Sequence, residues 1–114
     1  MWLYTDFGFF SVVKNEYCKE DELVVRCRSM DDFHRLREHC RDIEIEIPEV
    51  KEFPKAKYRF RVYMKARDVA AIVQESILDI RYDNFQNNCS GAYSDADREK
   101  ALHKIWTATK KYWR

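Results

Sequence analysis

Residues 58–80 decide the fold: Tyr58-Arg-Phe-Arg-Val-Tyr-Met-Lys65 runs directly into Ala66-Arg-Asp-Val-Ala-Ala-Ile-Val-Gln-Glu-Ser-Ile-Leu-Asp-Ile80. Apolar residues first recur at every second position and then at intervals of three and four, which predicts a strand followed at once by a helix. The apolar side of the strand is formed by Tyr58, Phe60, Val62 and Met64. The apolar stripe of the helix is formed by Val69, Ile72, Val73, Ser76, Ile77 and Ile80. Because each element buries one side, we expect the helix to pack on the sheet.

Length and composition indicate one domain over residues 1–114. The chain is 46% hydrophobic and 15% aromatic, which supplies enough apolar surface for a core despite 36% charged residues. Lys and Arg number 21 against 20 Asp and Glu, so the net charge is only +1. Any electrostatic function must therefore come from local segregation of charge.

The four cysteines show no Cys-x-x-Cys pair and no zinc-ribbon spacing. The N-terminal residues lack the basic region and apolar run of a signal peptide, and no apolar stretch reaches the ~18 residues of a membrane span. These features predict reduced thiols, a cytoplasmic location and no membrane partner. Histidines 34 and 39 are five residues apart and point in different directions on a helix, so the sequence predicts no metal site. The two glycines, Gly8 and Gly91, are too far apart for a Gly-rich phosphate loop, and no cofactor is predicted.

The N-terminal half predicts a hairpin followed by a helix. Residues 2–13 are aromatic and β-branched and are expected to form one long strand, in which Gly8 marks a bulge, a bend or a close approach by another backbone. Residues 22–28 alternate and are expected to pair antiparallel with that strand. Ser29 is expected to cap a helix that buries Phe33, Leu36 and Cys40 and turns Arg35, Arg37, Glu38, His39 and Arg41 toward solvent.

Residues 43–47 alternate as well, but Pro48 allows at most a short edge strand. Residues 79–88 are expected to form a short helical turn with Tyr82 and Phe85 inward, and residues 89–94 a loop. Asp95 or Ser94 is expected to cap a final helix with a buried stripe containing Leu102, Ile105, Trp106, Thr109 and Trp113. The predicted fold is α+β: a two-layer sandwich with an antiparallel or mixed sheet of three to four strands and helices on one face, in the order ββα(β)βαα.

The polar side of the predicted sheet is the first candidate binding surface. It carries Arg26, Arg28, Arg59, Arg61, Tyr63 and Lys65. Aromatic rings between arginines on an open sheet hold single-stranded nucleic acid by stacking and phosphate neutralisation. The alternative is that Glu44, Glu46, Glu49 and Glu52 pair with these arginines, or that the residues simply cover a solvated face.

Two further candidate sites lie in the C-terminal third. One is the polar cluster of Tyr82, Asp83, Asn84 and Asn87, for which turn formation is the structural interpretation. The other is the cationic side of the last helix, with Lys104, Lys111 and Arg114, which suits an acidic partner but also complements a helix dipole. A cysteine or histidine acting with residues 79–88 as a small enzyme is a third hypothesis, and no catalytic residue is predicted.

Two stretches carry a resemblance: Met1-Trp-Leu-Tyr-Thr-Asp-Phe-Gly-Phe-Phe-Ser-Val-Val13, and Ile80-Arg-Tyr-Asp-Asn-Phe-Gln-Asn87 with Ile105-Trp106 further along. They resemble a group of small uncharacterised bacterial proteins that begin with a similar run and carry a Tyr-Asp-Asn-Phe-Lys-Asn-like segment after a helix. Gln86 stands where that group has lysine, and residues 43–53 are more acidic here. The resemblance implies a compact bacterial or phage-type domain and transfers no catalytic residue.

Taken together, these patterns favour a non-enzymatic interaction protein that binds another macromolecule, with a protein as the first expected partner. A phage or mobile-element inhibitor of a host complex fits this size. The alternatives are a single-stranded nucleic-acid-binding module and a small enzyme with a Cys or His site. The oligomeric state is not predicted by the sequence.

Overall fold

The computed structural model describes residues 1–93 and 95–112, with side chains for all of these except residues 90–93. The chain forms two compact units, Met1–Ile80 and Arg81–Arg114. The expectations for Ser94, Trp113 and Arg114 lie outside the described residues. The expectation of a single domain over residues 1–114 stays a prediction.

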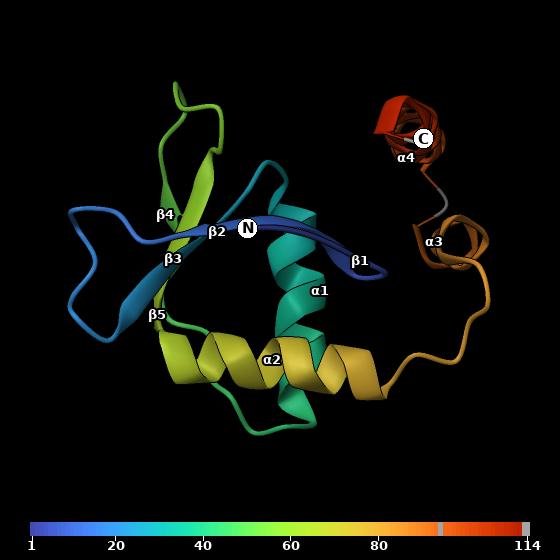
Figure 1. Cartoon of the computed structure of the whole chain (residues 1–114). Helices are drawn as coiled ribbons and strands as arrows, with labels where there is room; N and C mark the ends of the chain where they lie inside the picture. The colour runs from blue at the N-terminus through green and yellow to red at the C-terminus, as the bar shows by residue number, and fades with distance from the viewer. Residues whose placement is uncertain (94, 113–114) are drawn as a thin grey trace. The chain divides into compact units, whose positions relative to one another are not determined.

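The first unit contains a five-stranded sheet and two helices (Figure 1). Its strands are β1 (Trp2–Thr5), β2 (Gly8–Val13), β3 (Glu22–Cys27), β4 (Lys51–Glu52) and β5 (Phe60–Lys65), in the spatial order β1-β2-β3-β5-β4. Every neighbouring pair is antiparallel. The helices are α1 (Met30–Arg41), which packs on β2 and β3, and α2 (Ala66–Leu78), which packs on β3 and β5. The predicted α+β class is confirmed, with one strand more than expected.

The core lies between the sheet and these two helices. Val62 and Met64 of β5, as the alternation predicts, are buried against Val69 and Ile72 of α2. The buried apolar residues of α1 are the predicted Phe33, Leu36 and Cys40. The stripe of α2 ends earlier than expected, because Ile77 and Ile80 are exposed and the helix itself ends at Leu78.

The expectation of one long strand over residues 2–13 is wrong, because the chain reverses at Asp6 and Phe7 to form the β1–β2 hairpin. The Thr5 hydroxyl fixes this turn by accepting the Gly8 N–H at 3.0 Å and donating to the Gly8 carbonyl at 2.7 Å. A Cβ atom at Gly8 would lie 2.9 Å from Asp32 of α1. Gly8 therefore does mark a bend and a close approach, although the approaching group is a side chain and not a backbone.

Asp32 and Arg35 fasten this turn to α1. The buried Asp32 carboxylate accepts the Phe9 N–H at 3.2 Å and pairs with Arg35, whose Nε donates to the Phe7 carbonyl at 2.8 Å. Helix α1 begins after Ser29 as expected, but the Ser29 side chain makes no capping hydrogen bond. Arg35 and His39 were expected in solvent; both are half-buried, and the His39 ring stacks on Phe7 at 4.5 Å.

Residues 43–47 form no strand. A turn follows α1, and Glu44 has a φ of 57°, a left-handed conformation that interrupts extended backbone. The alternation still describes burial, since Ile43, Ile45 and Ile47 pack against the core. The strand in this region is the short β4, which pairs with the start of β5.

The second unit contains α3 (Phe85–Tyr93), α4 (Ala96–Thr109) and the 3-10 helix η1 (Lys110–Tyr112). The expectation of a loop from residue 89 is wrong, because α3 continues to Tyr93. Asp95 caps α4 as predicted by accepting the N–H groups of Asp97 and Arg98. The predicted stripe of α4 is not buried: among its described residues none is buried, and Ile105 and Trp106 are exposed.

Candidate binding face of the sheet

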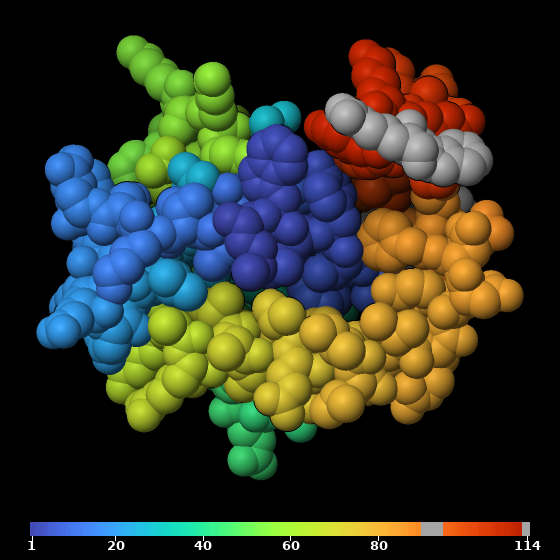
Figure 2. Space-filling model, in the orientation of Figure 1, coloured from blue at the N-terminus to red at the C-terminus, as the bar shows by residue number. Residues whose placement is uncertain are grey.

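One face of the sheet is not covered by α1 or α2, and we call it the open face. Val12, Val25 and Val62 are paired across β2, β3 and β5 and lie in the core. Side chains alternate along strands, so the next paired row, Ser11, Arg26 and Arg61, points to the open face. The loop of residues 14–21 and the turn of residues 53–59 project from the first unit beside the strands (Figure 2).

Tyr58 is the centre of the cationic part of the open face. The Cζ atoms of Arg26 and Arg28 lie over its ring, 4.6 and 5.2 Å from the ring centroid. Arg26 is held in place by a 2.7 Å hydrogen bond from its Nη2 to the Ser11 hydroxyl. The expectation that Tyr58 shares the apolar side with Phe60 is therefore wrong. The residue precedes β5, which begins at Phe60, so strand alternation does not govern it.

Aromatic rings continue from Tyr58 across β2 to the edge strand β1. Phe9 lies 6.3 Å from Tyr58, stacks on Tyr4 at 4.5 Å, and meets Trp2 edge-on at 6.3 Å. We call these four residues the aromatic row. Trp2 is 67% exposed at its end. Partial burial raises the pKa of Tyr4, the neighbouring Tyr58 raises it further, and Arg28 opposes the shift.

The predicted cationic residues fall into three settings. Arg26, Arg28 and Arg61 are on the open face, and within the described residues none of them forms an ion pair with a carboxylate. Arg59 pairs with Glu52 of β4, with Nη2 and Oε1 2.5 Å apart, as the alternative interpretation proposed for the arginines. Lys65 is exposed at the end of β5, opposite Glu22 of β3.

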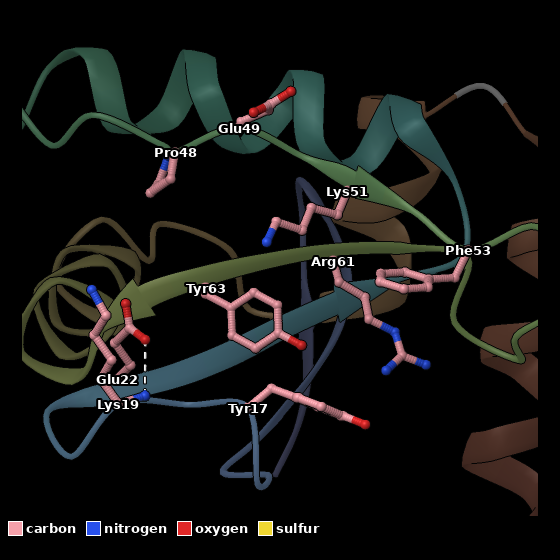
Figure 3. Close-up of a pocket in the computed structure, with 9 residues that line it drawn as sticks. All are labelled: Tyr17, Lys19, Glu22, Pro48, Glu49, Lys51, Phe53, Arg61 and Tyr63. Carbon is pink, nitrogen blue, oxygen red and sulfur yellow. Dashed lines mark hydrogen bonds between the residues drawn. The ribbon is translucent and has the colours of Figure 1, made fainter.

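A groove of about 800 Å³ opens beside β5, and we call it the Tyr63 groove (Figure 3). Its walls are residues of the 14–21 loop and β3 on one side and of the segment around β4 on the other. The lining residues are Tyr17, Lys19, Glu22, Pro48, Glu49, Lys51, Phe53, Arg61 and Tyr63. Of these, the sequence predicts Arg61 and Tyr63 as binding residues. The two-residue strand β4 brings Lys51 opposite Arg61, a pairing too short to leave a sequence pattern.

The polar cluster near residue 84 has a structural role. Asn84 Oδ1 accepts the Asn87 N–H at 3.0 Å, which satisfies an amide in the first turn of α3. The rings of Tyr82 and Phe85 lie 5.9 Å apart, and Asp83 is exposed. Lys104 and Lys111 are exposed on α4 and η1.

Two groups that could act as nucleophiles are Ser76, which lies beside a histidine, and the Cys40 thiol. Ser76 Oγ lies 3.2 Å from His39 Nε2, but it also donates to the Ile72 carbonyl at 2.7 Å. The serine proton is thus directed at a carbonyl and not at the imidazole, whereas a base that activates a nucleophile must accept that proton. Burial raises the pKa of the Cys40 thiol to about 11, which keeps this thiol protonated at neutral pH. Within the described residues, no three His, Cys, Asp or Glu side chains cluster as metal ligands.

Among the described residues, no helix is both long and apolar enough to span a membrane. Comparison with protein-family models, with curated proteins and with solved structures finds no match to this chain.

Proposed function

We propose that this protein is a non-enzymatic binding module that holds single-stranded nucleic acid on the open face of its sheet. The observation that supports the proposal is the placement of Arg26 and Arg28 over Tyr58, next to the aromatic row. Within the described residues neither arginine is neutralised by a carboxylate. Their guanidinium groups can therefore meet phosphates while the rings meet bases.

The chemistry of the face suits a single strand better than a duplex. Unpaired bases stack on aromatic rings and on guanidinium planes, whatever their identity, and phosphates are neutralised by nearby cations. The half-buried Phe9 contacts the other three rings of the row: exposed Trp2, half-buried Tyr4 and Tyr58. A duplex hides the faces of its bases and could use the cations alone. We therefore expect a preference for single strands with little dependence on sequence.

The test is the affinity for a fluorescent oligothymidylate as a function of salt. Each phosphate contact adds a slope of about −0.7 in log K against log salt for single strands, so Arg26, Arg28 and Arg61 together predict a slope of about −2. Arg26→Glu combined with Arg28→Glu should abolish binding. The matched control is Arg37→Glu combined with Arg67→Glu, which makes the same charge change at exposed positions of α1 and α2. Absence of binding at low salt, or equal loss in the control, would refute the proposal.

Stacking is tested separately by Tyr58→Leu. This change keeps an apolar side chain and both arginines, but removes the ring under them. Loss of one stacked base costs about 1–3 kcal/mol of binding free energy, which corresponds to a roughly 5- to 150-fold weaker complex. The salt slope should stay unchanged, because no phosphate contact is lost. A smaller salt slope in this variant would instead mean that phosphate contacts are lost, and that Tyr58 acts only by positioning the arginines.

A protein partner is the second candidate, supported by the second unit. Ile105 and Trp106 are exposed on α4, and Lys110 Nζ lies 4.3 Å from the Trp106 ring centroid. An apolar patch with cations at its edge suits an acidic protein surface. A captured protein would support this function if Trp106→Ala releases it and the Arg26→Glu, Arg28→Glu variant retains it. The opposite pattern would assign the interaction to the open face.

A further inference from the structure

The Tyr63 groove contains two cations whose charge is not used within the protein. Arg61 Nε donates to the Tyr58 carbonyl at 3.3 Å, and its Cζ lies 5.0 Å from the Phe53 ring centroid. Lys51 Nζ lies 5.4 Å from the Tyr63 ring centroid. Within the described residues, neither Lys51 nor Arg61 is paired with a carboxylate. These three contacts are with rings or a carbonyl, so the positive charge of each side chain remains available to an anion.

Two tyrosine hydroxyl groups lie at the Arg61 end of the groove. In Figure 3 the hydroxyl ends of Tyr17 and Tyr63 point toward the end of the groove where the Arg61 guanidinium lies. Of the two acidic lining residues, Glu22 is engaged at the other end, where its Oε1 accepts the Lys19 N–H at 2.9 Å. Glu49 points away from the other side chains (Figure 3). The groove therefore offers a cation with hydroxyl donors at its Arg61 end, and a second cation, Lys51, over the ring of Tyr63 (Figure 3).

We infer that the Tyr63 groove binds a nucleotide that carries a phosphomonoester, with the phosphate at Lys51 and Arg61 and the base against an aromatic ring of the lining. The inference rests on the proposed function and assigns one part of that surface to a defined ligand chemistry. A volume of about 800 Å³ lies within the range of small-ligand sites, about 300–1,000 Å³. A phosphomonoester carries about −1.5 to −2 charges, so it gains more from two cations than a singly charged internal phosphate does.

Two sources supply this chemistry: the phosphorylated end of a strand, or a free mononucleotide. Arg61 and Tyr63 belong to β5, which also pairs with β3 of the open face, so a strand on that face can reach the groove with one end. A free mononucleotide would occupy the groove without using the aromatic row. The two sources thus differ in whether Tyr58 contributes to the affinity: it does for a strand and does not for a free mononucleotide.

The experiment compares labelled oligothymidylates that end in a 5′-phosphate, a 3′-phosphate or hydroxyl groups only, each bound to the full chain. Thymidine monophosphate alone is measured by calorimetry. We expect one phosphorylated end to raise affinity about tenfold over the unphosphorylated strand. Lys51→Gln should remove this gain while leaving the unphosphorylated strand bound. Lys55→Gln, which changes an exposed lysine of the neighbouring turn that does not line the groove, should keep it.

The outcomes separate the two proposals. If all three strands bind equally and thymidine monophosphate does not bind, the groove inference is overturned while the proposed function stands. If no strand binds, both are overturned. If thymidine monophosphate binds and competes with the phosphorylated strand, and Tyr58→Leu weakens only the strand, the groove is assigned to the strand end. Binding of the mononucleotide with no gain for any phosphorylated strand overturns the strand-end assignment.

Discussion

On the covered face of the sheet, Val62 and Met64 of β5 are buried against α2, while the alternate residues Arg61 and Tyr63 stay half-exposed on the open face. The covered face contains apolar side chains whose removal from water stabilises the fold. The open face contains rings and guanidinium groups stacked on one another, with Trp2 and Arg28 at its exposed margins. The difference indicates that changes on the covered face should affect stability, and changes at the exposed residues of the open face should affect binding.

The largest effect on stability is expected for Phe33→Ala, a change on the covered face. Phe33 is fully buried between α1 and the sheet, so truncation leaves a cavity and should lower the free energy of unfolding by about 3–5 kcal/mol. Trp2→Ala removes an even larger side chain from the open face, where it is 67% exposed, and should change stability by only about 0.5 kcal/mol. Urea denaturation followed by circular dichroism measures both. A similar cost for the two variants would contradict the division between the faces.

The sequence predicts the covered face well because its apolar residues recur at the periods of a strand and a helix. Alternation along β3 and β5 and the stripe of α1 depend only on which residues share a side of a strand or helix. The β1–β2 turn was missed because residues 2–13 are aromatic and β-branched throughout, and the turn depends on one threonine hydroxyl and a tight approach by Asp32. The residues that approach each other here are far apart in the sequence, so no local sequence pattern indicates the contact.

The open face was predicted only in part. Arg26, Arg28 and Arg61 follow from alternation, whereas Tyr58 reaches the face from a turn that alternation does not describe. Arg59 was assigned to the face, but its ion pair with Glu52 depends on β4, which has two residues. The Tyr63 groove depends on the same short strand and on the loop that contains Tyr17. The sequence alone therefore does not predict those parts of the site that depend on loops and on short strand pairings.

A medium effect is expected for Asp32→Ala. This carboxylate is buried and connects α1 to the β1–β2 hairpin through the Phe9 N–H and Arg35. Its loss removes the acceptor of the Phe9 N–H and the ion pair with Arg35, and should lower the free energy of unfolding by about 1.5–3 kcal/mol. Asp31→Ala is the matched control, since Asp31 lies in the same first turn but is exposed, and it should cost at most about 1 kcal/mol. Equal costs would mean that Asp32 acts through the helix dipole and not through the hairpin.

The smallest expected effect is the pH dependence that Cys40 contributes from the covered face. Burial raises the pKa of this thiol from 9.0 to about 11, so between these values the folded state binds more protons than the unfolded state. Stability that is present below pH 9 is then lost as the pH rises toward 11, with a slope of at most about 1.4 kcal/mol per pH unit. Other groups titrate in this range, so the measurement is the difference in slope between the natural chain and Cys40→Ala. Cys18→Ala is the control, because Cys18 is only half-buried and no comparable burial acts on it. If Cys40→Ala leaves the slope of the unfolding free energy against pH unchanged, burial does not raise the pKa of this thiol. Solvent would then reach the covered face at the end of α1.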